Sequence, residues 1–150
     1  MVELTELYQW LHSNGVLMFD RKLAFSNQRT RAIGINLCED DTYGIFVDFS
    51  RIESRADEKA TMLHECGHYA TGATHKVSSR YDLIEKHEYK ADKWAIKRAL
   101  SPSELDQAIA EGCENIWELA EHFGVTEDLM RKAVSLYTYG NLDCKDYLPM

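Results

Sequence analysis

The sequence lacks the features that mark secreted, membrane-spanning and nucleic-acid-binding proteins. Its four cysteines are scattered and form no C-x-x-C pair, which argues against a secreted disulfide framework and favours reduced thiols in a cytoplasm. The first ten residues lack the basic start and apolar core of a signal peptide, and no apolar run is long enough to span a bilayer. No basic run occurs either, and 17 Lys and Arg against 25 Asp and Glu give a net charge of −8. We therefore expect neither a membrane partner nor direct nucleic-acid binding.

Repeats, low-complexity segments and linkers are also absent. A chain of 150 residues suits one domain and can bury about two-thirds of its unfolded surface. The sequence therefore predicts a single domain over residues 1–150, with residues 138–150 as a tail because they show no periodicity. Nothing in the sequence indicates the oligomeric state.

Hydrophobic periodicity predicts an α+β fold in which a small sheet precedes a helical C-terminal half. An amphipathic helix is expected over residues 2–13. Three β-rich runs follow, at 16–19, 32–37 and 43–49, and we expect them to form one small antiparallel sheet packed on a helix at 55–71. The last two runs are separated by an acidic turn at 38–41 and read as a hairpin. Further helices are predicted at 81–100, 103–111, 116–123 and 126–137.

The helix predicted at 55–71 carries the sequence His64-Glu65-Cys66-Gly67-His68, a match to H-E-x-x-H. Ser54 and Asp57 support the start of this helix as an N-cap and an acidic third residue. On a helix the two histidines lie one turn apart on one face, where they can bind one metal ion. The glutamate between them, Glu65, then projects beside the metal as a general base.

A catalytic zinc usually takes three protein ligands, so a third is sought downstream. Glu88 and Asp92 form an E-x-x-x-D pair on the next predicted helix. This spacing lets Glu88 bind the metal while Asp92, one turn further on, accepts a hydrogen bond from a ligand histidine and fixes the orientation of its ring. Glu85 is the main rival as third ligand, but the residue four places after it is Tyr89 rather than an acid.

A third histidine would be an alternative to a glutamate ligand. The metzincin pattern needs Gly three residues after the second motif histidine and His six residues after it. Gly72 and His75 are each one place late for that pattern. A one-residue insertion would therefore have to leave the turn geometry intact for His75 to reach the metal.

These motifs resemble those of the ImmA/IrrE-type metallopeptidases, a family of bacteria and their mobile elements. The match lies in H-E-C-G-H at 64–68, in E-Y-K-A-D-K-W-A at 88–95 and in the Ser-Pro turn at 101–102. Trp94 stands where the family pattern E-x-x-A-[ND]-x-F-A usually has Phe. The order and length of the predicted elements also agree, from about residue 30 to residue 137.

The resemblance implies a zincin-like fold, a zinc ion held by His64, His68 and Glu88, and catalysis by Glu65. It further implies a substrate class, the helix-turn-helix repressors of phages, integrative elements or stress regulons, which such enzymes inactivate by cleavage. In this chemistry Glu65 takes a proton from the attacking water and passes it to the leaving amine. A further donor often helps at the carbonyl oxygen, and the sequence offers Tyr81, His75 and His87 as candidates.

Two further stretches bear on how a partner would bind. The run at 43–49 precedes the motif helix, and as an edge strand it could hold an extended peptide, or it could be an interior strand with no such role. Residues 119–136 have the pattern of a helix-turn-helix, with a glycine at the turn. Its second helix offers Arg131 and Lys132 but also Glu127 and Asp128, so a helical hairpin that covers the core is favoured over a DNA reader. Three hypotheses stand: a zinc endopeptidase, a zinc-containing protein that binds a repressor with little or no cleavage, and a DNA-binding regulator.

Overall fold

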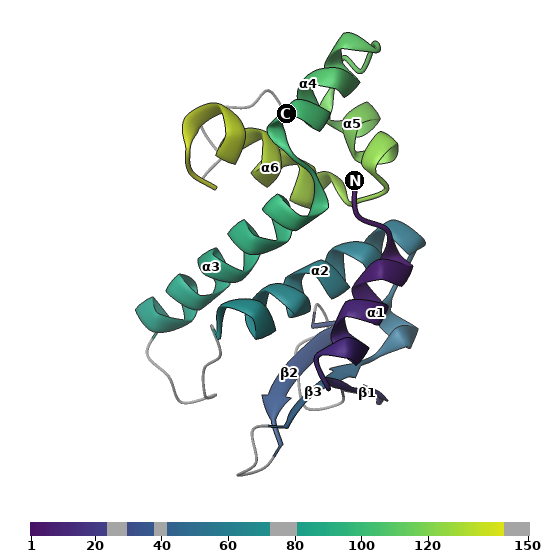
Figure 1. The fold of residues 1–150 in the computed structure, drawn as a ribbon, viewed down its shortest axis with the longest axis vertical. Coiled ribbons are helices and arrows are strands. Elements are labelled where there is room, and N and C mark those ends of the chain that lie inside the picture. Colours follow the sequence, from purple (N-terminus) through teal and green to yellow (C-terminus); the bar gives the residue numbers. More distant parts are fainter. Residues whose placement is uncertain (24–29, 38–41, 73–80, 143–150) are drawn as a thin grey trace.

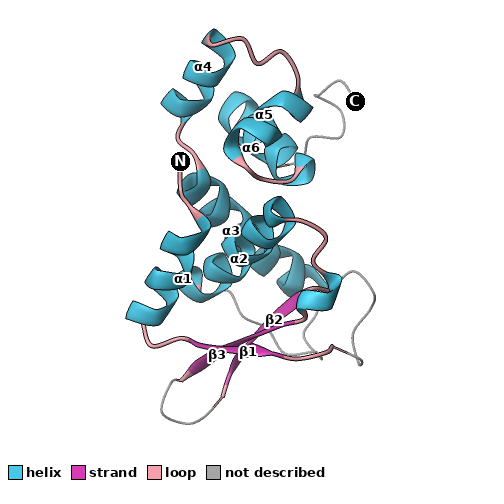
Figure 2. Cartoon of the chain, turned by 90° about the vertical axis from the view of Figure 1, so that its right-hand side faces the viewer, coloured by secondary structure: helices cyan, strands magenta, loops and turns pink. Residues whose placement is uncertain are grey.

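The computed structural model describes residues 1–23, 30–37, 42–72 and 81–142. Over these residues the chain is α+β and mostly helical, as predicted, with six α-helices and a three-stranded sheet. Figures 1 and 2 show the sheet at one end of the molecule with α1 and α2 next to it, α3 packed on α2, and α4 to α6 at the opposite end. The elements in chain order are α1 (Leu4–Ser13), β1 (Leu17–Asp20), β2 (Ala32–Asn36), β3 (Tyr43–Val47), a 3-10 turn η1 (Phe49–Arg51), α2 (Arg55–Thr71), α3 (Tyr81–Ala99), α4 (Pro102–Ala110), α5 (Ile116–Phe123) and α6 (Glu127–Tyr139).

The sheet is mixed, and its strand order is β1-β3-β2. The predicted hairpin of β2 and β3 is present, with Ile33 opposite Phe46 in antiparallel register. The prediction of a wholly antiparallel sheet is wrong, because β1 pairs with β3 in parallel, with Leu17 beside Gly44. Burial explains why β3 takes the centre: four of its five residues are buried, whereas three of the four in β1 are exposed. The most apolar strand thus gains a neighbour on both sides.

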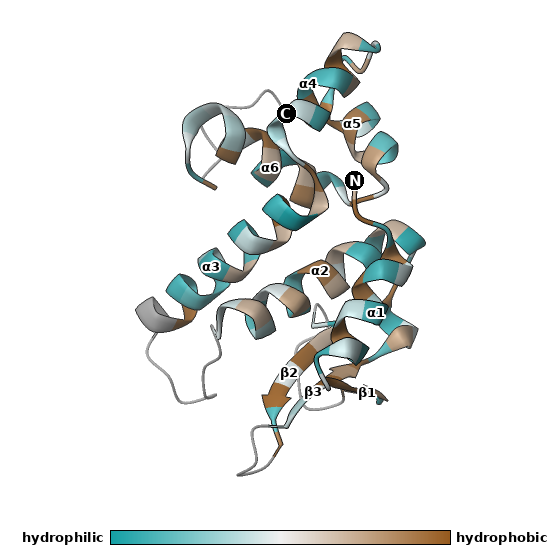
Figure 3. Ribbon diagram, viewed as in Figure 1, coloured by the Kyte–Doolittle hydropathy of each residue, from teal (hydrophilic) through white to brown (hydrophobic). Residues whose placement is uncertain are grey.

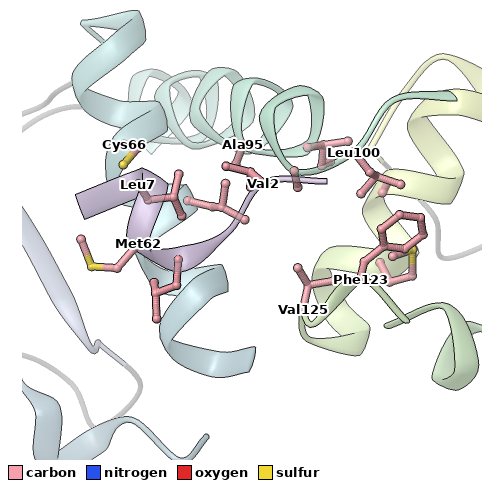
Figure 4. Packing of buried hydrophobic residues seen from close by; sticks show 14 of the residues in the cluster. Val2, Leu7, Met62, Cys66, Ala95, Leu100, Phe123 and Val125 are labelled. Carbon is pink, nitrogen blue, oxygen red and sulfur yellow. The ribbon is translucent and has the colours of Figure 1, made fainter. Parts of the chain in front are cut away.

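The core joins the inner face of the sheet to all six helices. Leu7 and Leu11 of α1 and Ile45 of β3 are fully buried, and they pack in one cluster with residues of α2, α3 and the C-terminal helices. Figure 4 shows part of this cluster, with Leu7 and Met62 on one side and Leu100 and Phe123 on the other. Figure 3 shows that β2 and β3 are largely hydrophobic, whereas α3 carries long hydrophilic stretches. Among the described residues, no helix is both long enough and apolar enough to cross a membrane.

Helix α2 begins and ends where its sequence predicts. The Ser54 side chain accepts a hydrogen bond from the Asp57 backbone N–H, and Gly72 ends the helix in the left-handed conformation at φ 65°. The predicted tail begins too early, since α6 continues to Tyr139 and Leu142 beyond it is only 8% exposed. Residues 143–150 lie outside the described part of the chain.

Helices α2 and α3 pack very closely, and a glycine makes this possible. A Cβ atom on Gly67 would lie 2.3 Å from the backbone carbonyl oxygen of Ala91, so no larger residue fits there without displacement. Ala91 and Ala95 on the facing side of α3 are buried as well. The small residues that the sequence places on both helices therefore bring the two backbones together, which is what a site shared between the helices needs.

Candidate metal centre

Three side chains from α2 and α3 converge on one point. The Nε2 atom of His64 lies 2.8 Å from Oε2 of Glu88, and Nε2 of His68 lies 3.0 Å from Oε1 of the same carboxylate. The two Nε2 atoms are 3.1 Å apart. One ligand atom from each residue lies within 4.8 Å of the others, so the group could hold a metal ion. The structure thus brings together the two motif histidines and Glu88, as their spacing on two helices predicts.

The chemistry of these atoms fits a divalent cation. Two imidazole nitrogens and one carboxylate form a mixed nitrogen and oxygen set of the kind that transition metals and zinc take. His64 uses its other ring nitrogen, Nδ1, for Asp92, which leaves Nε2 to point at Glu88. A metal ion that displaced the Nε2 protons would meet the lone pairs of all three groups in the same small volume.

The charges around these groups also favour a cation. Burial lowers the pKa of His64, but its hydrogen bonds with Asp92 and Glu88 outweigh that effect and raise the pKa to about 10. Burial works to raise the pKa of Glu88, yet hydrogen bonds from His64 and His68 hold it well below its usual range. The carboxylates of Glu88 and Asp92 therefore stabilise positive charge at the two histidines, either as protons on the rings or as a metal ion bound between them.

Asp92 lies behind His64; the sequence predicts a contact with one of the two motif histidines but not with which one. Its Oδ1 is 2.8 Å from Nδ1 of His64, so the carboxylate fixes the tautomer and the orientation of that ring. Its other oxygen, Oδ2, accepts a hydrogen bond from Nζ of Lys132 at 3.1 Å. Lys132 comes from α6, forty positions away along the chain, and in the sequence it reads only as a possible DNA contact. The spacing of charges along α3 gives no signal for this partner.

Glu65 is buried beside the cluster. Its residue is only 6% exposed, and burial raises the pKa of its carboxyl to about 7 against the opposing effect of His64 and His68. A carboxyl group with such a pKa can accept and return a proton near neutral pH. The position and the pKa of Glu65 thus suit the role that the motif predicts for it.

Of the other candidate residues from the sequence, some lie outside the cluster and the rest lie outside the described residues. Glu85 is exposed on α3 and is not part of the group that could hold a metal. His87 is partly buried but does not line the cleft around the cluster. His75 and the side chain of Tyr81 lie outside the described residues.

The cluster opens into a cleft of about 710 Å³. One wall is β2, where Ala32, Ile33 and Gly34 line the cleft, and the floor is formed by α2 and α3. The opposite wall is the first part of α6, through Thr126, Asp128, Leu129 and Lys132. An edge strand and a helix N-terminal segment thus flank the three converging side chains.

One residue of this cleft is missed by the sequence analysis. Tyr43, the first residue of β3, lines the cleft, and its hydroxyl is buried with no hydrogen-bond partner among the described residues. It reaches this place across Gly34 of the neighbouring strand, since a Cβ there would lie 1.8 Å from the tyrosine oxygen. In the sequence Tyr43 reads only as the start of a strand, and although the hairpin of β2 and β3 is predicted, the register that sets Tyr43 over Gly34 has no local signal.

The chain was also compared with protein-family models, with curated proteins and with solved structures, and none of them matches it. The resemblance to the ImmA/IrrE-type metallopeptidases continues to rest on the motifs at 64–68 and 88–95. What the site can do is therefore argued from its geometry.

Proposed function

We propose that the protein is a zinc-dependent endopeptidase with a zincin-like architecture. The observation that supports it most is the convergence of His64, His68 and Glu88 at the bottom of a cleft, with the Glu65 carboxyl buried beside them. Two histidines and one carboxylate are a ligand set of catalytic zinc sites, which keep a further position for water or substrate. A bound zinc supplies Lewis acidity, which makes water more acidic and polarises a carbonyl group.

The residues of the chain divide the remaining work. Glu65 takes the proton of the attacking water on its carboxylate and delivers it to the nitrogen of the leaving amine. Asp92 holds the ring of His64 in the orientation that directs Nε2 to the cluster. Both roles need only small movements, because the groups are fixed on two tightly packed helices.

The substrate is proposed to lie along β2. For the run at 43–49 the sequence allows two interpretations, an edge strand that could hold a peptide and an interior strand. In the structure β3 is the central strand, with a neighbour on both sides. In the described sheet β2 is an edge strand, and its residues form a wall of the cleft. An extended peptide can pair with such an edge through its main chain, which places a peptide bond beside the metal cluster.

The substrate class that we propose, a helix-turn-helix repressor, follows from the resemblance. Cleavage would take place in the cytoplasm, a compartment that also agrees with the scattered cysteines of the sequence. A role in reading DNA has less support. Lys132 of α6 pairs with Asp92 and Asp128, and Arg131 pairs with Glu127. The basic side chains that a recognition helix would present to phosphates are thus neutralised by acidic neighbours.

The test is incubation of the zinc-loaded protein with a candidate helix-turn-helix repressor, chosen from the genes that neighbour its own, followed by mass measurement of the fragments. The wild-type protein should yield defined fragments. Glu65→Gln keeps the size of the side chain but removes the base, so zinc content and fold should persist while cleavage falls by several orders of magnitude. If Glu65→Gln keeps its full regulatory effect in cells, the endopeptidase hypothesis is wrong, and the protein acts by binding the repressor.

A further inference from the structure

The hydroxyl of Tyr43 is the most unusual polar group of the cleft. The residue is only 5% exposed, and its hydroxyl finds no hydrogen-bond partner among the described residues. A buried hydroxyl without a partner destabilises a fold, and native structures contain few of them. Phenylalanine would fill the same space without that cost. Among residues 1–23, 30–37, 42–72 and 81–142 nothing hydrogen-bonds the tyrosine oxygen, which points to a partner that arrives with a ligand.

The surroundings of the hydroxyl are shaped to admit it. Gly34 lies on the edge strand β2, and a Cβ atom at this position would come within 1.8 Å of the Tyr43 oxygen. Any other residue at 34 would therefore push the phenol out of its place. Both residues line the metal cleft, so the glycine allows the phenol of the central strand to reach the wall along which a peptide is proposed to bind.

The phenol is a lasting donor at this place. Burial raises the pKa of Tyr43, and the negative charge of Glu65 nearby raises it further, so the hydroxyl keeps its proton. A neutral O–H beside the general base cannot serve as a second base. It can donate a hydrogen bond to an oxygen of a bound ligand, and the bond gains strength as that oxygen becomes negative.

We propose that Tyr43 is a catalytic residue whose hydroxyl donates a hydrogen bond to the scissile carbonyl oxygen of a peptide bound along β2. As water adds to the carbonyl carbon, the C=O π electrons move onto this oxygen, and the phenol stabilises the charge while it keeps its own proton. The water proton passes to Glu65 and then to the amine nitrogen, and the C–N bond breaks. This inference rests on the proposed endopeptidase function.

The test is Tyr43→Phe, with Tyr69→Phe as its matched control. The ring of Tyr69 lies 5.2 Å from that of Tyr43, but its hydroxyl donates to the Asn14 carbonyl oxygen, away from the cluster. In Tyr43→Phe, kcat should fall about 10²–10³-fold with little change in KM, the loss typical of a removed oxyanion donor. Zinc content should equal that of wild type, and the melting temperature should be equal or higher, because an unpaired buried hydroxyl is removed. Tyr69→Phe should keep full activity.

A second variant reaches the same hydroxyl from the other strand. Gly34→Ala puts a methyl group where the Tyr43 oxygen now lies, so the phenol is displaced and kcat should fall to a similar degree with zinc retained. A third measurement avoids turnover. Calorimetry with a peptide phosphonamidate, whose anionic tetrahedral group resembles the adduct, should show about 10–100-fold weaker binding to Tyr43→Phe than to wild type.

The outcomes separate this inference from the proposed function. If Tyr43→Phe cleaves the repressor and binds the phosphonamidate as well as the wild-type protein does, Tyr43 has no catalytic role, but the endopeptidase function is unaffected. Loss of zinc from Tyr43→Phe would overturn it too, because the residue would then act on the metal site rather than on substrate. A wild-type protein that neither cleaves the repressor nor binds the phosphonamidate would refute the endopeptidase and, with it, the catalytic tyrosine.

Discussion

In the proposed zinc site the third ligand is a single carboxylate of α3. Glu88 reaches both motif histidines, whereas Glu85 is exposed one turn earlier. We expect Glu88→Ala to lose most of the bound zinc, since it removes one of three ligands, and Glu85→Ala to keep it. His64→Ala and His68→Ala should also remove the metal. Elemental analysis of the purified variants measures this directly, and the reverse behaviour of the two glutamate variants would move the ligand to Glu85.

In the proposed zinc site Asp92 would act on the metal through its hydrogen bond to His64, so substitutions of Asp92 should have graded effects on zinc affinity. Asp92→Ala leaves the Nδ1–H of His64 without its acceptor and should weaken zinc affinity by about 10–100-fold. Asp92→Asn retains an oxygen acceptor without the charge, so its loss should be smaller. Competition against a chelator gives both affinities, and melting of the metal-free proteins shows whether the fold is intact. Wild-type affinity in Asp92→Ala would mean that the carboxylate has no part in metal binding.

Between elements, the decisive contact is the one between α2 and α3. Alanine is intrinsically better than glycine in a helix by about 1 kcal/mol, but Gly67→Ala also drives a methyl group against the Ala91 carbonyl. Overpacking of this kind costs about 1–3 kcal/mol, so the variant should be less stable despite its better propensity. It should also bind zinc more weakly, because α3 and Glu88 move away from the histidines. Denaturant unfolding and chelator competition test this, with Ala70→Ser on the exposed side of α2 as control.

The elements themselves were largely predictable, because their signals are local. The caps at Ser54 and Gly72 set the bounds of α2, and the hairpin of β2 and β3 follows from two β-rich runs around a short turn. The partner and direction of β1 have no such signal. A strand of four residues with three exposed side chains carries no pattern that tells which neighbour it joins. Its parallel pairing with β3 is a property of the assembled sheet.

The same distinction holds within the site. His64, His68, Glu88 and Asp92 follow from spacings of four residues on helices, so their convergence could be predicted once two helices were expected to pack. The position of the Tyr43 side chain in the cleft depends on the register of β2 and β3, which sets its ring diagonally over Gly34. Lys132 depends on how α6 lies against α3, a contact between elements that are separate in sequence. Tertiary packing selects both residues, and no local pattern marks them.

At the scale of the whole molecule, two lysines join the C-terminal helices to the helices of the metal centre. Lys59 of α2 is 5% exposed and donates to the backbone oxygen of Phe123 at the end of α5, with a distance of 2.7 Å. Lys132 of α6 donates to Asp92 on α3. Lys59 thus links the hairpin of α5 and α6 to α2, and Lys132 links it to the cluster through Asp92 and His64.

These two attachments should have different consequences when each lysine is replaced by methionine. Lys59→Met leaves the Phe123 carbonyl without its buried donor and should lower the free energy of unfolding by about 1–3 kcal/mol, with zinc affinity unchanged. Lys132→Met frees one oxygen of Asp92, so the carboxylate can turn away from His64. Zinc affinity should then fall, though by less than the roughly 10–100-fold expected when the carboxylate itself is lost. If Lys132 supports the site through Asp92, its substitution should have no further effect on zinc affinity in an Asp92→Ala background. Chelator competition on the single and double variants measures this coupling. If Lys132→Met lowers zinc affinity equally in the wild-type and Asp92→Ala backgrounds, α6 supports the candidate metal centre by packing alone. The hydrogen bonds from Lys132 through Asp92 to His64 would then make no contribution to zinc affinity.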